Sequence, residues 1–258
     1  MPSDSLKSKW ASLLAEAVSS PGLVSEAYHA FHGYSLGNQV LALWQCRLRG
    51  LQPGPISTYP GWQAKGRQVK RGEKGIELCM PVARKRKAKR EDEDDETFTL
   101  FVYRPFWFVL AQTEGDPVET PPIPDWDRAS ALAALGITEV PFENLDGNLL
   151  GYAKGQEIAV NPLNPMPHKT TFHEAAHVLL GHVAEGKISE GERPPKNLRE
   201  AEAESVALLC CESLGLPGAE YCRGYIQDWL AGDVIPEKSA QKIFHAADQI
   251  LRAGHTTA

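Results

Sequence analysis

Residues 171–182 read TFHEAAHVLLGH, and this stretch decides how the C-terminal half of the chain folds. Apolar residues lie on nearly every side of it, which predicts a buried helix over residues 169–184. His173 and His177 are four residues apart, so their Cβ atoms lie about 5–6 Å apart on one face. Buried imidazoles beside a buried carboxylate, Glu174, need a partner, and a cation meets that need. We therefore predict that His173 and His177 bind one metal ion; the alternative is a surface helix with two solvent-facing histidines.

A catalytic zinc site takes a third protein ligand and keeps one open coordination position. A second helix is predicted over residues 197–214, and Glu200 and Glu204 share one of its faces. We predict Glu200 as the third ligand and Glu204 as the partner of an imidazole N–H. Acidic residues also favour the start of any helix through its dipole, so this alternative stays open. Glu202 lies on another face, where we expect it to be solvated.

His182 follows His177 by five residues, which turns it away on a continuous helix, so we expect a structural role or a part in polarising the substrate. One Zn²⁺ at the site would lower the pKa of its water to about 7, and Glu174 is placed to accept the proton as general base. Glu174 would then return the proton to the leaving amine. The strand 156–160 is expected to align an extended peptide at its edge. The sequence therefore predicts a zinc metallopeptidase with an unknown protein or peptide substrate.

The chain has 258 residues, of which 42% are apolar and 23% charged, so it can bury cores and is not disordered throughout. No run of 18 apolar residues occurs, which excludes a membrane span, and no secretory signal is visible. The five cysteines form no CxxC pair, which favours reduced thiols in the cytoplasm.

The charge is distributed unevenly along the chain. Residues 1–90 hold 15 basic and 5 acidic side chains, whereas residues 114–258 hold 11 basic and 22 acidic ones. A basic front half indicates a polyanion as partner. Within it, the glycine-rich segment 59–76 combines five cations with two aromatic residues, a pairing that binds single-stranded nucleic acid. A basic hairpin with core aromatics is the alternative. The candidate DNA-binding residues are Tyr34, Asn38, Gln39, Tyr59, Trp62, Lys65, Arg67, Gln68, Lys70, Arg71 and Lys74.

The remaining patterns predict an α+β fold in two domains, the second mainly helical with a small sheet. Helices are expected over 6–18, 34–49, 128–135, 221–231 and 236–253, and strands over 76–81 and 97–110. The charged block 84–96 is expected to be a solvated hairpin loop. Four prolines among acidic residues make 115–127 the best linker in the chain.

Several short motifs in order resemble the N-terminal domain of ArdC-type antirestriction proteins over residues 25–115. These motifs are Tyr34-Ser35, Asn38-Gln39, Tyr59, Trp62, Gly66-Arg67-Gln68-Val69, Gly72-Glu73-Lys74-Gly75-Ile76 and Pro81. Residues 140–215 resemble the zinc metallopeptidase domain of the same proteins and of ImmA/IrrE-type peptidases. The resemblance implies a single-stranded-DNA-binding domain over 1–115, a linker over 116–136 and a zincin-like metallopeptidase domain over 137–258.

The resemblance also implies a plasmid- or phage-linked protein that binds single-stranded DNA and helps incoming DNA to escape restriction. In this interpretation the protein combines DNA binding with a peptidase site and has no membrane partner. Two alternatives stay open. One is a non-enzymatic DNA-masking protein with a structural or vestigial zinc, and the other is a regulatory peptidase that cleaves a repressor. The oligomeric state is not predicted.

Overall fold

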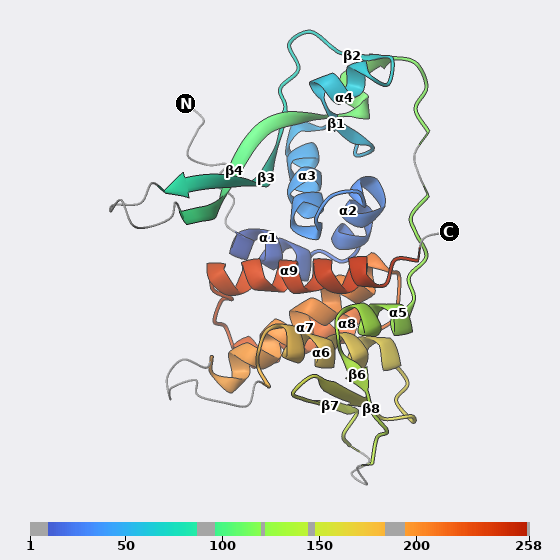
Figure 1. Cartoon of the computed structure of the whole chain (residues 1–258), viewed down its shortest axis with the longest axis vertical. Helices are drawn as coiled ribbons and strands as arrows, with labels where there is room; N and C mark the ends of the chain where they lie inside the picture. The colour runs from blue at the N-terminus through green and yellow to red at the C-terminus, as the bar shows by residue number, and fades with distance from the viewer. Residues whose placement is uncertain (1–9, 87–95, 120–121, 144–147, 184–193, 257–258) are drawn as a thin grey trace. The chain divides into compact units, whose positions relative to one another are not determined.

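The computed structural model describes residues 10–86, 96–119, 122–143, 148–183 and 194–256 (Figure 1). The chain divides into two compact units, residues 1–40 with 122–258 and residues 41–121. The first residues therefore pack with the C-terminal part, which differs from a division at residue 115. The domains predicted from the sequence, residues 1–115 and 137–258 with a linker between them, remain a prediction.

The first unit is mainly helical and is built around one buried helix. Its elements are α1 (Trp10–Ser19), α2 (Leu23–Phe31), the start of α3 (Leu36–Arg49), α5 (Arg128–Ala134), β6 (Thr138–Glu139), β7 (Gly151–Lys154), β8 (Glu157–Val160), α6 (Pro167–Leu179), α7 (Lys196–Ser213), α8 (Ala219–Leu230) and α9 (Glu237–Ala253). Every residue of α7 from Ala201 to Ser213 is buried, and α7 packs against α2, α6, α8 and α9. The small residues of α7 let these helices approach closely.

Polar side chains of the C-terminal helices hold the N-terminal ones. The carboxylate of Glu237 accepts hydrogen bonds from the amides of Trp10 and Ala11, 2.8 and 2.9 Å long, and so satisfies the start of α1. The carboxylate of Asp248 does the same for the amide of Leu36 at the start of α3. These caps explain why α1 and the start of α3 belong with the C-terminal part, and α2 joins them by packing against α7. Helix α2 was not predicted, because Pro21 and Gly22 separate it only briefly from α1.

The sheet of the first unit has the order β6-β8-β7, with β8 parallel to β6 and antiparallel to β7. The expectation that residues 156–160 form an edge strand was therefore wrong. The parallel partner β6 lies far back in the sequence and contains only two residues, so periodicity gave no sign of it. Within the described residues, no strand pairs with the outer side of β7, which makes β7 an edge.

The second unit contains the rest of α3, two small sheets and a short helix. Its elements after α3 are β1 (Ile56–Thr58), α4 (Tyr59–Gln63), β2 (Arg67–Val69), β3 (Ile76–Arg86), β4 (Glu96–Val109), the 3₁₀ turn η1 (Leu110–Gln112) and β5 (Thr113–Gly115). One antiparallel sheet has the order β1-β4-β3, and β2 pairs with β5. Helices and small sheets together confirm the α+β class. Residues 87–95 of the charged block lie outside the described residues.

A β-bulge in the long hairpin is held by a buried glutamine. Ile76 pairs with Trp107 and Leu78 with Arg104, so β4 has one extra residue opposite Glu77. The side chain of Gln45 on α3 donates to the carbonyl of Glu77 and accepts from its amide, at 2.8 and 2.9 Å. Both backbone groups that the bulge leaves unpaired are thereby satisfied.

Among the described helices, none is long and apolar enough to cross a bilayer.

Candidate metal centre

Helix α6 carries both histidines of the motif on a well-anchored scaffold. Phe172 is fully buried and packs its ring against Trp126, with the ring centroids 5.2 Å apart. Ala175 and Ala176 are buried too, so the helix cannot rotate without exposing its core face. This anchoring leaves only the orientation of the imidazoles to be fixed by their partners.

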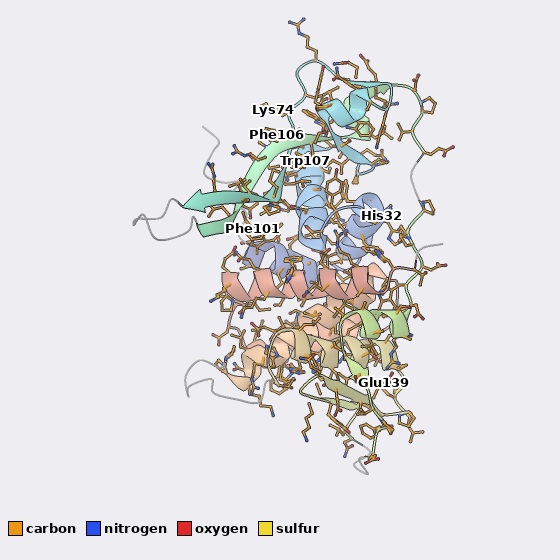
Figure 2. All side chains as sticks on the ribbon, viewed as in Figure 1. His32, Lys74, Phe101, Phe106, Trp107 and Glu139 are labelled. Atoms are coloured by element: carbon orange, nitrogen blue, oxygen red, sulfur yellow. The ribbon has the colours of Figure 1, made fainter. Side chains whose placement is uncertain are left out.

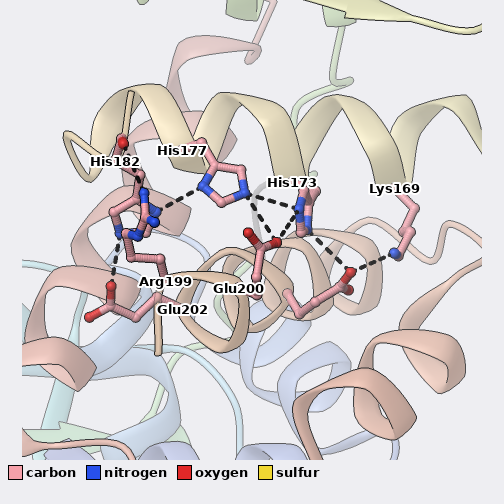
Figure 3. Close-up of polar contacts among 8 residues, drawn as sticks. Lys169, His173, His177, His182, Arg199, Glu200 and Glu202 are labelled. Atoms are coloured by element: carbon pink, nitrogen blue, oxygen red, sulfur yellow. Dashed lines mark hydrogen bonds and ion pairs between the residues drawn. The ribbon is translucent and has the colours of Figure 1, made fainter. Parts of the chain in front are cut away.

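The two histidines of α6 and Glu200 of α7 come together in space (Figure 3). The Nε2 atoms of the two histidines are 3.1 Å apart. Oε2 of Glu200 lies 3.4 Å from Nε2 of His173 and 3.5 Å from Nε2 of His177. One ligand atom from each of the three residues lies within 4.8 Å of the other two. Two imidazole nitrogens and one carboxylate oxygen form a donor set that suits zinc and other first-row divalent metals. The three residues therefore fit a metal ion, as the sequence predicts.

Glu204 lies on the other side of His173, one turn further along α7. Its Oε1 is 3.2 Å from Nδ1 of His173 and 2.8 Å from the ammonium of Lys169, which is itself buried. Burial favours the protonated form of Glu204, but the contacts with His173 and Lys169 outweigh it and lower the pKa of the carboxyl. An ionised Glu204 can accept the Nδ1–H of His173 and turn Nε2 toward Glu200, which is the place that the sequence predicts for it.

His182 holds the second imidazole. Helix α6 ends at Leu179, and Gly181 takes a left-handed conformation with φ of 74°. The amide of His182 then donates to the carbonyl of His177, as in a Schellman motif. The chain turns back, and Nδ1 of His182 comes within 2.9 Å of Nδ1 of His177. The expectation that His182 points away was wrong, because it assumed that the helix continued.

Glu202 completes this side of the site. Its Oε2 lies 2.8 Å from Nε2 of His182, and the residue is only 3% exposed. The expectation that Glu202 is solvated was therefore wrong as well. Burial raises the pKa of the carboxyl, but its contact with His182 more than offsets this and keeps the pKa below the usual value. Their spacing in the sequence did not indicate this pair, because only the turn at Gly181 brings the side chains of His182 and Glu202 together.

Glu174 is placed for proton transfer beside the three candidate ligands. It is buried, and burial raises the pKa of its carboxyl. A Cβ on Gly151, the first residue of β7, would lie 3.3 Å from its Oε1, so the carboxylate faces the start of that strand. Burial lowers the pKa of His173, but the contacts with Glu200 and Glu204 outweigh burial and raise it to about 9. The two carboxylates thus favour the protonated, positively charged form of His173.

The candidate DNA-binding residues are not all accessible. Trp62 is fully buried, and its indole N–H donates to the carbonyl of Phe108 at 2.7 Å. Gln39 is 2% exposed, and its amide donates to the carbonyl of Tyr34. The prediction that Trp62 and Gln39 contact DNA is therefore wrong, because both are used to satisfy the interior. Tyr34 and Asn38, like Gln39, belong to the first unit, where both are half-buried.

The other candidates lie at the surface of the second unit, and several have structural partners. The guanidinium of Arg67 donates to Thr113 and to the carbonyls of Gly115 and Asp116, and so ties β2 to β5. Lys70 donates to the carbonyl of Ala111. The exposed candidates are Tyr59, Lys65, Gln68, Lys70, Arg71 and Lys74.

Comparisons with known proteins show which family and which solved structures the chain is similar to. Residues 7–107 match the family described as the N-terminal domain of anti-restriction factor ArdC. The antirestriction protein ArdC from plasmid R388 has a similar structure in its metal-free form, with a TM-score of 0.56 and 20% sequence identity over 98% of this chain and 96% of that one. Its Mn(II)-bound form gives a TM-score of 0.53 and 20% identity over 99% and 100%. A search of curated proteins gave no match. The resemblance seen in the sequence thus agrees with the family match over residues 7–107, and the chain as a whole shares the fold of the ArdC protein.

Proposed function

We propose that this protein is a metal-dependent peptidase of the ArdC type whose second activity is to bind single-stranded DNA. The observation that supports the peptidase part is the convergence of His173, His177 and Glu200 within 4.8 Å, with the buried carboxylate of Glu174 beside them. Three protein ligands leave a coordination position open, which separates catalytic sites from closed structural ones.

Zinc suits this donor set better than manganese does, because sites of nitrogen and oxygen ligands bind zinc more tightly in the Irving–Williams order. When bound, the metal supplies a Lewis acid and a water whose pKa is lowered to about 7. Glu174 accepts a proton from the attacking water and later donates it to the leaving amine. Burial raises the pKa of this carboxyl, which makes it a stronger base toward the water.

The outer edge of β7 is the place we propose for the substrate. Gly151 has no side chain between the backbone of this strand and the carboxylate of Glu174. An extended peptide that adds to β7 as a further strand would carry its carbonyl groups past Glu174. The alignment role that the sequence assigned to residues 156–160 thus moves to the neighbouring strand.

Two variants test the peptidase. His173→Ala is expected to lose the bound metal, which is measured by metal analysis of the purified protein. Glu174→Gln keeps the ligands and should keep the metal, but lose cleavage of a protein substrate such as unfolded casein. Loss of cleavage in Glu174→Gln together with full metal content supports the proposal. A wild-type protein that holds one metal ion but cleaves nothing, with or without single-stranded DNA, favours a structural or vestigial metal.

The DNA-binding part is supported by the second unit. Lys65, Lys70, Arg71 and Lys74 are exposed there around a short sheet, and cations of this kind track phosphates. Together with the ArdC match over residues 7–107, this favours a role in protecting DNA from restriction. Replacing Lys65 and Arg71 by Ala should weaken binding of an oligothymidylate and reduce the dependence of its affinity on salt. An unchanged salt dependence would place the DNA site elsewhere.

A further inference from the structure

Strand β4 presents a row of aromatic side chains on the outer face of its sheet. Phe101 is 70% exposed and Phe106 is 53% exposed, although large apolar side chains usually lie inside. Tyr103 and Phe108 are half-buried. Figure 2 shows Phe101 and Phe106 along this strand.

The register shows that the four rings share one face. Ile76 and Leu78 are buried, so their face of β3 points into the core. Trp107 and Arg104 pair with these two residues and lie on the same face. Because side chains alternate along a strand, the neighbours of Trp107 and Arg104 point the other way. These neighbours are Phe106, Phe108 and Tyr103, and Phe101 follows two residues from Tyr103.

The bulge is what allows this arrangement. Phe101 and Phe106 are five residues apart and would lie on opposite faces of a regular strand. The extra residue opposite Glu77 restores Phe106 to the face of Phe101, and Gln45 holds the bulge in place. A bulge that re-aims a side chain is typical of a binding surface.

An exposed lysine lies near one end of the aromatic row, whereas Arg104 lies on the opposite face of the strand. Lys74 is exposed and precedes Gly75, where any side chain would overlap the carbonyl of Pro105, next to Phe106. Figure 2 shows Lys74 close to Phe106. This end of the row therefore combines a flat apolar ring, that of Phe106, with the positive charge of Lys74.

We propose that this face of β4, and not Trp62, is the platform on which single-stranded DNA stacks its bases. Unpaired bases stack on aromatic side chains while cations hold the phosphates, and the sequence of the strand matters little. Phe101 and Phe106 are separated by about 16 Å, the length of roughly five stacked bases. The positive charge of Lys74 beside Phe106 favours a nucleic acid, which is a polyanion, as the molecule that binds this face. This inference rests on the proposed DNA-binding function and assigns it a place.

The test is binding of a fluorescent twenty-nucleotide oligothymidylate to the full chain, followed by anisotropy at several salt concentrations. Phe101→Leu and Phe106→Leu keep an apolar side chain but remove the ring. Each is expected to weaken binding about fivefold or more, because each stacked base contributes about 1 kcal/mol at least. The salt dependence should not change, since stacking releases no counterions. Tyr221→Leu, an equally exposed aromatic residue on α8, is the matched control and should bind like wild type.

The outcomes separate this inference from the proposed function. If wild type binds the oligonucleotide and both Phe variants bind it equally well, the stacking platform is wrong and DNA binding is located elsewhere. If wild type does not bind even at low salt, the DNA-binding function itself fails. If the variants bind DNA normally but convert a dimer into a monomer in light scattering, the face joins two copies, and the inference is overturned. A melting temperature equal to that of wild type shows that the variants are folded.

Discussion

Replacing His182 by Phe tests whether the carboxylate–histidine pair next to His177 supports the metal site. If His177 binds the metal through Nε2, its Nδ1 carries the proton and donates it to Nδ1 of His182, 2.9 Å away. Nε2 of His182 then carries a proton and donates it to Glu202 at 2.8 Å. This assignment of protons satisfies every nitrogen of the pair. His182→Phe keeps the ring and the volume but removes both contacts.

Two effects are expected, and they can be separated. Loss of the partner of an imidazole ligand lowers metal affinity about 10- to 100-fold. The carboxylate of Glu202 also loses its closest partner while buried, which destabilises the fold by about 3–5 kcal/mol. In the double variant His182→Phe/Glu202→Gln no charge is left unpaired. It should therefore recover most of the stability but none of the metal affinity.

Metal affinity is measured by competition with a chelator, and stability by denaturant unfolding of the metal-free protein. Lys196→Ala is a suitable control on the same helix as Glu202, because the ammonium of Lys196 lies over the ring of Trp229, 5.9 Å from its centroid. The reasoning is refuted if His182→Phe binds metal as tightly as wild type. It is refuted equally if the double variant recovers metal affinity together with stability, because one packing defect would then explain both losses.

Three further predictions concern stability away from the metal centre. Burial raises the pKa of Tyr28 to about 12, so its contribution to stability is complete below pH 10 and is lost as the pH rises through 12; Tyr28→Phe should remove this part of the alkaline loss in a pH-dependent unfolding series. Gln45→Met leaves the amide and carbonyl of Glu77 without their partner and should lower the free energy of unfolding by about 1–3 kcal/mol, as measured with urea. Trp62→Ala should lower it by about 3–5 kcal/mol, and a variant that instead unfolds like wild type while losing DNA binding would mean that Trp62 is exposed.

The sequence predicted those parts that depend on local periodicity and spacing. The helices of the C-terminal part and the β3–β4 hairpin lie close to their predicted positions, because each has a strong apolar pattern. The approach of Glu200 to His173 and His177 also followed from spacing, since both helices present these residues on one face. What these predictions share is that the pattern within each element shows which residues lie on its buried or ligand-bearing face.

Three of the failures needed information from outside the element that was predicted. His182 and Glu202 meet because Gly181 reverses the chain, which a helical period cannot show. Trp62 looked like a stacking residue, but its indole finds the carbonyl of Phe108, 46 residues further on. The aromatic row on β4 was hidden by the bulge, since strict alternation places Phe101 and Phe106 on opposite faces. In each case a tertiary contact decided where the side chain points.

The charges around the site link metal binding to the burial of its acidic residues. Glu174, Glu200 and Glu204 bring three carboxylates together, and Lys169 supplies one positive charge among them. Buried carboxylates without compensating charge destabilise a fold, and a divalent cation would offset the two that Lys169 leaves. The same cation would bind only where Glu204 and His182 keep both Nε2 atoms turned inward. Metal binding and the burial of these acids therefore stabilise each other, because without the ion part of their charge is balanced only by a proton on His173, whose pKa they raise to about 9.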